Sequence, residues 1–266
     1  MQTRAFAIGG ELCYAIAMAT RGQAALVTGA GQRIGRAIAL RLAADGWAVG
    51  VHYHQSRTAA EKLVREIVAQ GGRAAAFKGD LASPRTPPLV VRQAAKDLGT
   101  LRLLVNNAAL FEPDDIQRIT PARLERTLAV NLAAPLFLAQ AFAQQAAKAK
   151  SANIINLLDQ RVWNLAPDFL SYTLAKSGLW TLTRILAQAL APTIRVNGIG
   201  PGPVLPSARQ SAVHFERSAK ATPLRRGAEP SEIADAVMFL LAAPAMTGQM
   251  LALDGGQHFQ RGAQAE

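Results

Sequence analysis

The sequence predicts an α/β fold in which a single domain is built around a doubly wound parallel sheet of about seven strands. From Gln23 onward, short and uniformly apolar runs alternate with longer runs whose apolar residues recur at helical spacing. Strands that are apolar on both faces are typical of a parallel sheet covered by helices on both sides. The chain has 266 residues, 50% of them hydrophobic, which is enough for one large core and excludes a disordered or fibrous chain.

The predicted elements follow one another as strand and helix along the chain. Apolar, β-rich runs predict strands over residues 24–28, 47–53, 73–78, 101–106, 153–158, 194–199 and 250–253. Helical spacing predicts helices over residues 34–44, 58–70, 86–98, 121–147, 169–191 and 230–241. Residues 200–228 hold four prolines and show no clear periodicity, so we expect a long loop there that serves as a substrate lid.

The first twenty residues differ from the domain, which we expect to span residues 21–266. Glu11 interrupts their weakly apolar run, so the segment does not match the apolar centre of a signal peptide. We therefore expect residues 1–20 to be a poorly ordered extension and the protein to be cytoplasmic. Cys13 is the only cysteine, which excludes an internal disulfide and a cysteine-based zinc cluster, and we expect no metal site.

The chain is strongly basic. Its 29 Lys and Arg residues exceed its 18 Asp and Glu residues, and the formal net charge of +11 favours an anionic partner. The basic residues do not cluster, since Arg225 and Arg226 are the only adjacent pair, and no aromatic residues interleave with a basic tract. No apolar stretch approaches the ~18 residues of a membrane span. The charge alone therefore indicates an anionic partner and no more, and we expect neither a nucleic acid nor a membrane as a partner. The small-molecule partner that we expect is predicted by the motifs that follow.

A glycine-rich turn, Thr28-Gly-Ala-Gly-Gln-Arg-Ile-Gly35, lies where the first predicted strand passes into the first helix. Gly29 and Gly31 allow a tight turn and a close approach of the backbone to a ligand, and Gly35 lets the helix pack on the sheet. The N-terminus of that helix then faces the pyrophosphate of a dinucleotide. In this strand–turn–helix context the turn predicts a Rossmann fold that binds a dinucleotide cofactor.

The loop after the second predicted strand distinguishes the two nicotinamide cofactors. Enzymes that bind NAD commonly place an acidic residue there, on the ribose 2′-hydroxyl. This sequence has His52-Tyr-His-Gln-Ser-Arg57 instead, without an acid. Four side chains can donate hydrogen bonds to a 2′-phosphate, so NADPH/NADP is favoured over NADH/NAD; they are Arg33, His54, Ser56 and Arg57. The alternative is that this loop is an ordinary solvated turn.

Tyr172 and Lys176 lie four residues apart in a predicted helix and therefore share one face of it. A free tyrosine has a pKa near ~10 and is a poor acid–base catalyst at neutral pH. A lysine ammonium a few ångströms away favours the phenolate, so we expect Lys176 to lower the pKa of Tyr172. Taken alone, the spacing is also met by two unrelated surface residues.

Taken together, these motifs resemble the short-chain dehydrogenase/reductase family over residues 23–257. The resemblance is carried by the glycine turn, Asn106-Asn-Ala-Ala109, the Tyr172/Lys176 pair and Pro201-Gly202. Four patterns look like the pteridine reductase branch, which includes the bacterial dihydromonapterin reductases: Thr-Gly-x-x-x-Arg-x-Gly, His-Tyr-His-x-Ser, Asn-Asn-Ala-x-x-Phe-x-Pro and Ile-Ile-Asn-x-x-Asp.

The resemblance implies a role for each matching residue. Tyr172 is the proton donor, Asn131 supports a proton-relay water, and Asp80 meets the adenine amine. Phe111 stacks a flat pterin against the nicotinamide. The implied catalytic residues are Tyr172, Lys176, Asp159 and Asn131. The implied cofactor-binding residues are Thr28, Gly29, Gly31, Arg33, Ile34, Gly35, His54, Ser56, Arg57, Asp80, Leu81, Asn107, Ala108, Lys176, Pro201 and Gly202. The expected substrate-binding residues are Phe111, Asp159, Trp163 and Tyr172. Family members of this size also imply a homotetramer.

Asp159 stands thirteen positions before Tyr172, where the family tetrad normally has a serine. A serine donates a hydrogen bond to a carbonyl, whereas an ionised carboxylate accepts and would repel a developing alkoxide. Aspartate suits a C=N bond, whose nitrogen must gain a proton, so the sequence favours an NADPH-dependent reductase of a dihydropterin-like ring. Two alternatives stay open: a general NADPH-dependent carbonyl or 3-oxoacyl reductase, and a non-catalytic NADP(H)-binding regulator.

Gln55, Ala109 and Leu110 depart from the pteridine reductase pattern. Pteridine reductases often carry Arg at the position of Gln55, and Arg57 compensates for it. A serine of their Asn-Asn-Ala-Ser stretch is replaced by Ala109. Because these hydroxyl groups are lost, the sequence supports a pterin less strongly than the complete motif would. Another flat substrate, bearing an imine or a carbonyl, is the alternative.

Overall fold

Seven parallel strands form one sheet in the computed structural model, which describes residues 22–147, 151–206 and 211–260. The strand order is β3-β2-β1-β4-β5-β6-β7. The strands are β1 (Ala24–Val27), β2 (Ala48–Tyr53), β3 (Arg73–Lys78), β4 (Leu101–Asn106), β5 (Ala152–Leu157), β6 (Ile194–Pro201) and β7 (Met250–Leu253). The predicted fold class is confirmed. The proposed extension, residues 1–20, lies outside the described residues.

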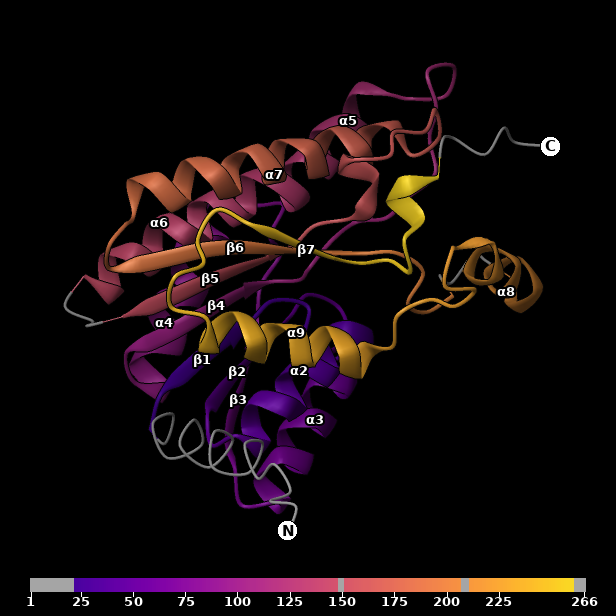
Figure 1. Ribbon diagram of the computed structural model, residues 1–266. Coiled ribbons are helices and arrows are strands. Elements are labelled where there is room, and N and C mark those ends of the chain that lie inside the picture. The colour runs from indigo at the N-terminus through magenta and orange to yellow at the C-terminus, as the bar shows by residue number, and fades with distance from the viewer. Residues whose placement is uncertain (1–21, 148–150, 207–210, 261–266) are drawn as a thin grey trace, which may run out of the picture.

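Helices cover both faces of the sheet (Figure 1). One layer holds α2 (Arg33–Ala44), α3 (Arg57–Ala69) and α9 (Pro230–Ala242). The other holds α4 (Thr86–Leu98), α5 (Pro121–Leu128), α6 (Ala134–Ala146) and α7 (Leu170–Ala189). Because the chain builds β1 to β3 outward and then returns to place β4 beside β1, the loops after β1 and β4 diverge. Ligands of doubly wound sheets bind at such a switch point.

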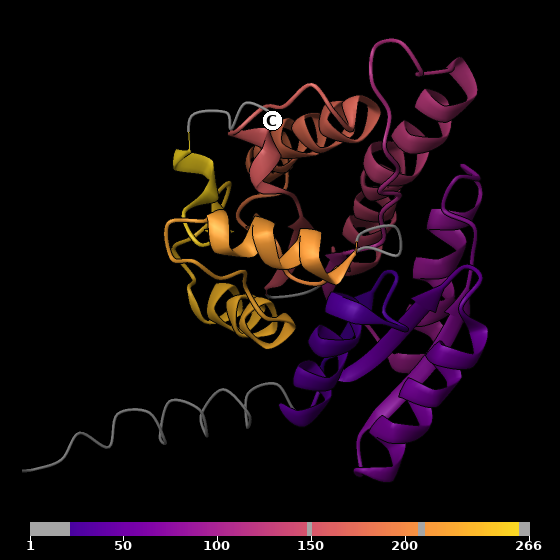
Figure 2. The same cartoon turned by 90° about the vertical axis from the view of Figure 1, so that its right-hand side faces the viewer.

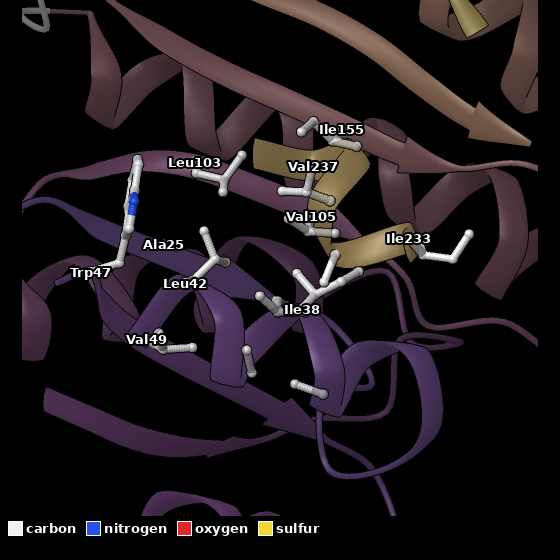
Figure 3. Packing of buried hydrophobic residues seen from close by; sticks show 14 of the residues in the cluster. Ala25, Ile38, Leu42, Trp47, Val49, Leu103, Val105, Ile155, Ile233 and Val237 are labelled. Atoms are coloured by element: carbon white, nitrogen blue, oxygen red, sulfur yellow. The ribbon is translucent and has the colours of Figure 1, made fainter. Parts of the chain in front are cut away.

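The core explains why the strands lack the alternation of an exposed sheet. All four residues of β1 are buried; Ala25 and Val27 pack toward the α2–α9 layer, whereas Ala24 and Leu26 pack toward the α4–α6 layer. Figure 3 shows Ile38 and Leu42 of α2 packed among strand residues in the first of these layers, with residues of α9 nearby. Both faces of the sheet therefore need apolar side chains, because a layer of helices packs on each of them.

The predicted loop over residues 200–228 is wrong in one part, because it contains the helix α8 (Ala212–Ala221). This helix buries none of its residues, so it needs no apolar stripe and gives no periodic signal in the sequence. Ser211 caps it by accepting a hydrogen bond from His214 N–H at 3.2 Å. Figure 2 faces the carboxyl ends of the strands and shows α8 lying across this end of the molecule.

The predicted helix over residues 121–147 is interrupted by a π-helical turn, Ala129–Ala133, between α5 and α6. Pro135 follows directly in the first turn of α6. Since proline has no N–H to continue the hydrogen-bond ladder, it favours such an irregularity. The turn places Asn131 and Val130 toward the interior of the domain, where both are buried.

The helical stretch Pro121–Ala146 is long and apolar enough to cross a membrane by length and composition, since an 18-residue part of it has a mean hydropathy of 1.3. Half of that part is buried inside the domain, as in a core helix. Its residues Leu138 and Phe142 pack in the same core as the residues of α4. The absence of a membrane partner stays a prediction.

Leu42→Ala tests the packing of the α2 layer. The side chain of Leu42 is fully buried among the residues of β1, β2 and α2, so its truncation leaves a cavity. We expect the free energy of unfolding, measured in urea, to fall by about 2–5 kcal/mol. Leu89→Ala on α4 is the control, because that leucine is 55% exposed, and it should change stability by less than about 0.5 kcal/mol. Equal losses in the two variants would contradict the described core.

Candidate active site

A cavity of about 630 Å³ opens at the carboxyl ends of the strands, where the loops after β1 and β4 diverge. Sixteen of the residues expected at the site line it: Gly29, Arg33, Ile34, Gly35, His54, Ser56, Asp80, Leu81, Asn107, Ala108, Phe111, Asp159, Tyr172, Lys176, Pro201 and Gly202. Five others do not appear in its lining: Thr28, Gly31, Arg57, Asn131 and Trp163. The structure therefore brings together residues from the loops that follow six of the strands and from the helices α2 and α7. The five exceptions need separate accounts.

Thr28 supports the cavity from behind. Its buried hydroxyl donates to Val105 O at 3.2 Å and accepts from Asn107 N–H at 2.9 Å and Ala108 N–H at 3.0 Å. The Asn107 side chain donates in return to Thr28 O at 2.8 Å. These bonds join the loops after β1 and β4 at the point where they separate.

The glycine turn leaves no room for side chains. A Cβ on Gly35 would lie 2.5 Å from Gly29 O and 2.6 Å from Asn107 Nδ2, so only glycine fits there. Gly31 instead faces α3, with its Cβ position 3.2 Å from Ala60 N. The first turn of α2 has neither an acidic residue nor a side-chain cap, so its N–H groups remain suited to a phosphate.

His52, at the end of β2, is a site residue whose role the sequence did not predict. Its Nδ1 accepts from Gly29 N–H at 3.2 Å, and its Nε2 lies 3.1 Å from Gly79 O. This pair of partners requires the neutral ring with the proton on Nε2. Burial lowers the pKa of His52 to about 4, which keeps the ring neutral. His52 thus links the glycine turn to the loop after β3.

Two of the four donors predicted for a 2′-phosphate make other contacts. The Arg33 guanidinium lines the cavity and donates to Pro206 O at 2.8 Å and Leu205 O at 3.0 Å, which ties the glycine turn to the segment after β6. Arg57 donates to Glu61 at 2.6 Å, and this bond raises the pKa of Arg57. The structure does not bring Arg57 to the cavity. His54 and Ser56 both line it.

Asp159, Tyr172 and Lys176 form a cluster in the cavity wall. The Tyr172 hydroxyl donates to Asp159 Oδ2 at 2.9 Å. The other oxygen of Asp159 accepts from Arg161 N–H at 2.9 Å, at the start of the short η2 helix (Gln160–Val162). The Lys176 ammonium donates to Leu157 O at 2.5 Å and lies 5.6 Å from the centre of the Tyr172 ring. The spacing within α7 thus brings phenol and ammonium to one face, as predicted.

The expectation that Lys176 lowers the pKa of Tyr172 is wrong for this structure, in which that pKa is raised. Burial raises the pKa of Tyr172 well above its ordinary value, and the negative charge of Asp159 raises it further. Burial also raises the pKa of Asp159. Burial lowers the pKa of Lys176 to about 8, against the opposing effect of Asp159. The phenol therefore keeps its proton at neutral pH and is a donor.

Asn131 and Phe111 lie on the Tyr172 side of the cavity, where Phe111 is part of the lining and Asn131 supports it from behind. The Asn131 amide donates to Leu110 O and accepts from Leu110 N–H, both at 2.8 Å, so it holds the chain segment that follows β4. Phe111, the next residue, stacks on Phe169 with 4.2 Å between ring centres and meets the Tyr172 ring edge-on at 4.8 Å. Phe169, just before α7, carries no signal in the sequence.

Trp163 lies outside the cavity lining. Its ring packs edge-on against Trp180 and His258, with ring centres 6.4 Å and 5.2 Å away. Sequence reasoning also missed several lining residues: Gln32, Arg126, Arg161, Phe215, Ser218 and Gln257. Phe215 and Ser218 belong to α8, a helix that the sequence analysis did not predict because its residues show no apolar periodicity. No group of three or more potential metal-ligating side chains occurs among the residues that the structure describes.

Comparisons with known proteins agree with this geometry. A family model described as enoyl-(acyl carrier protein) reductase matches residues 29–258. A 3-oxoacyl-[acyl-carrier-protein] reductase of Synechocystis sp. is 33% identical over 238 residues, which cover 88% of this chain and 96% of the relative.

Solved structures are also similar over nearly the whole length. The FolM alternative dihydrofolate reductase 1 of Brucella canis, complexed with NADP, has a TM-score of 0.89 and 42% identity, covering 92% of this chain and 97% of that one. The corresponding protein of Brucella suis, in complex with NADP, has a TM-score of 0.88 and 43% identity, covering 91% and 97%. The family part of the resemblance seen in the sequence is confirmed: the chain belongs to the short-chain dehydrogenase/reductase family.

Proposed function

We propose that this chain is an NADPH-dependent reductase that reduces a C=N bond of a dihydropterin-like ring, with Tyr172 as the proton donor. One observation carries the proposal: Asp159 occupies the position of the family serine and accepts a hydrogen bond from the Tyr172 hydroxyl at 2.9 Å. An acceptor at this position suits a substrate that presents N–H groups. The similarity to two FolM alternative dihydrofolate reductases supports it.

The cofactor-binding half of the cavity fits NADPH. The uncapped first turn of α2 and the glycines beside it suit a pyrophosphate. At the end of β2 the lining residues are His54, Gln55 and Ser56, which can donate hydrogen bonds to a 2′-phosphate. Asp80, with an oxygen 3.8 Å from His54 Nε2, lines the cavity near the position expected for adenine. When bound, NADPH supplies the hydride.

The chain's own groups supply orientation and the proton. Phe111 lines the cavity and is 43% exposed, so it offers an aromatic face to a flat ring. Asp159 can accept a hydrogen bond from a ring amino group or ring N–H. The Tyr172 hydroxyl is protonated at neutral pH and lines the cavity, so it is the group placed to deliver a proton to the ring nitrogen that gains electrons. Each reduction thus adds one hydride to carbon and one proton to nitrogen.

Reduction of a 3-oxoacyl thioester is the second candidate, favoured by the relative from Synechocystis sp.. A carbonyl that accepts hydride develops negative charge on oxygen, and hydrogen-bond donors must stabilise it. Tyr172 is such a donor, but the Asp159 carboxylate beside it would repel that oxygen. A non-catalytic binding protein is the third candidate, and the clustering of Tyr172, Lys176 and Asp159 in the cavity wall opposes it.

A panel of substrates tests the proposal. We expect NADPH oxidation with dihydrobiopterin, dihydromonapterin or dihydrofolate, and at least about tenfold lower kcat/KM with an acetoacetyl thioester. The measurement is the loss of NADPH absorbance in the purified full chain.

The variant Asp159→Ser sharpens that test. It restores the family donor, so it should lower pterin turnover while leaving or raising thioester turnover. If the wild type reduces the thioester alone, the pterin proposal is wrong.

Tyr172→Phe removes the phenolic proton and keeps the ring that contacts Phe111. We expect kcat to fall about 100-fold or more, because a positioned acid contributes about 10²–10⁴ in rate. NADPH affinity, measured by fluorescence titration, should stay within about twofold. Loss of NADPH binding in this variant would show that Tyr172 has a different role.

The activity should depend on pH through Lys176. Its pKa of about 8 means that the ammonium is present below this pH and is lost above it. We expect kcat/KM to fall above pH 8, well below the pH at which an ordinary lysine titrates. Lys176→Arg keeps its charge at high pH and should move this fall to more alkaline pH. If kcat/KM falls above pH 8 in Lys176→Arg just as in the wild type, a group other than Lys176 causes the fall.

A further inference from the structure

Asp114 is a buried carboxylate that the proposed chemistry does not use. It is 4% exposed and lies between β4 and α5, in the same segment that carries Phe111. Carboxylates are almost never fully buried without partners, because their desolvation is costly. Its position therefore needs an explanation in terms of what it holds.

The partners of Asp114 all belong to the start of α7. Its Oδ2 accepts from the Ser171 hydroxyl at 2.5 Å, and its Oδ1 accepts from Ser171 N–H at 3.1 Å. Its backbone oxygen accepts from Leu170 N–H at 3.4 Å. Both carboxylate oxygens thus act as acceptors for one residue, which lies 57 positions later in the chain.

Helix α7 lacks a cap of its own. The preceding residue, Phe169, has the left-handed φ of 53° and makes no side-chain hydrogen bond to the helix. The first N–H groups of a helix have no partner within it, and a negative charge near them is favourable. Asp114 supplies both an acceptor and the charge from a distant part of the chain.

This cap lies next to the proposed proton donor. Tyr172 directly follows Ser171, so a shift in the first turn of α7 would move the phenol. The segment that carries Asp114 is held at its other end by Asn131, through both backbone groups of Leu110. Between the two anchors, Phe111 meets the Tyr172 ring at 4.8 Å. The segment thus contacts the start of α7 both at the backbone and at the Tyr172 ring.

We propose that Asp114 is a positioning residue for proton transfer: by capping α7 at Ser171 it holds the Tyr172 phenol and the Phe111 ring in their reacting arrangement. The inference rests on the role of Tyr172 in the proposed function, and it does not depend on which substrate is reduced. It assigns no contact between Asp114 and the substrate or the cofactor.

Three variants of the full chain test it. Asp114→Ala should lower kcat about tenfold or more, and Asp114→Asn should lower it less, because the amide keeps one acceptor for Ser171 N–H. Asp115→Ala is the matched control on the same segment, because the Asp115 carboxylate accepts from Gln117 N–H and Arg118 N–H, both at 2.9 Å. It should leave kcat within about twofold.

Two readouts separate positioning from a loss of stability. NADPH affinity should stay within about twofold in every variant, which also shows that the domain is folded. The solvent deuterium isotope effect on kcat should grow in Asp114→Ala, because a displaced phenol makes the proton transfer slower. Ser171→Ala should lower kcat as well, and the double variant should be no slower than Asp114→Ala, since the two residues act through one contact.

The outcomes are distinct. A wild-type kcat in Asp114→Ala, an equal loss in Asp115→Ala, or losses that multiply in the double variant would overturn the inference. If Asp114→Ala does not fold, Asp114→Asn and Ser171→Ala give the same test: a loss of kcat at unchanged NADPH affinity supports it, and a wild-type kcat in both overturns it. A fully active Tyr172→Phe would instead refute the proposed function.

Discussion

The buried hydroxyl of Thr28 is the contact on which the rest of the site depends. The strand order forces the loops after β1 and β4 to part, and three hydrogen bonds of this one hydroxyl fasten them together just before they do. The glycine turn is built on one side of this junction, and the segment with Phe111 and Asp114 on the other. The cavity between these two loops keeps a constant shape only if the loops are held together where they begin. The hydrogen bonds of Thr28 hold them there.

Burial acts in opposite directions on the groups of the cavity wall. It raises the pKa of Tyr172 and Asp159 and lowers that of Lys176, in each case disfavouring the charged form. The result is a phenol that holds its proton beside an acceptor. Such a pair suits proton donation to a nitrogen better than the stabilisation of an alkoxide, which is why the residue at position 159 determines the proposed substrate class.

Apolar periodicity and short motifs predicted the strands, most of the helices and the positions of most site residues in the fold. The strands were placed to within two residues, because apolar runs with turn signals at their ends define them well. Helix α8 was missed because an exposed helix needs no apolar stripe, and the π-helical turn because only Pro135 hints at it. The pKa of Tyr172 depends on burial, and the bond between Asp114 and Ser171 joins residues 57 positions apart, so neither leaves a local pattern.

The neutral His52 ring makes the free energy of unfolding depend on pH. In the unfolded chain this histidine titrates near ~6.5, whereas in the folded chain its pKa is about 4. Unfolding between these two pH values therefore takes up a proton, and its free energy falls as the pH is lowered through this window. Between pH 6.5 and 4 the decrease amounts to about 3 kcal/mol. The residue that fixes the glycine turn thus also sets an acid limit on the stability of the whole domain.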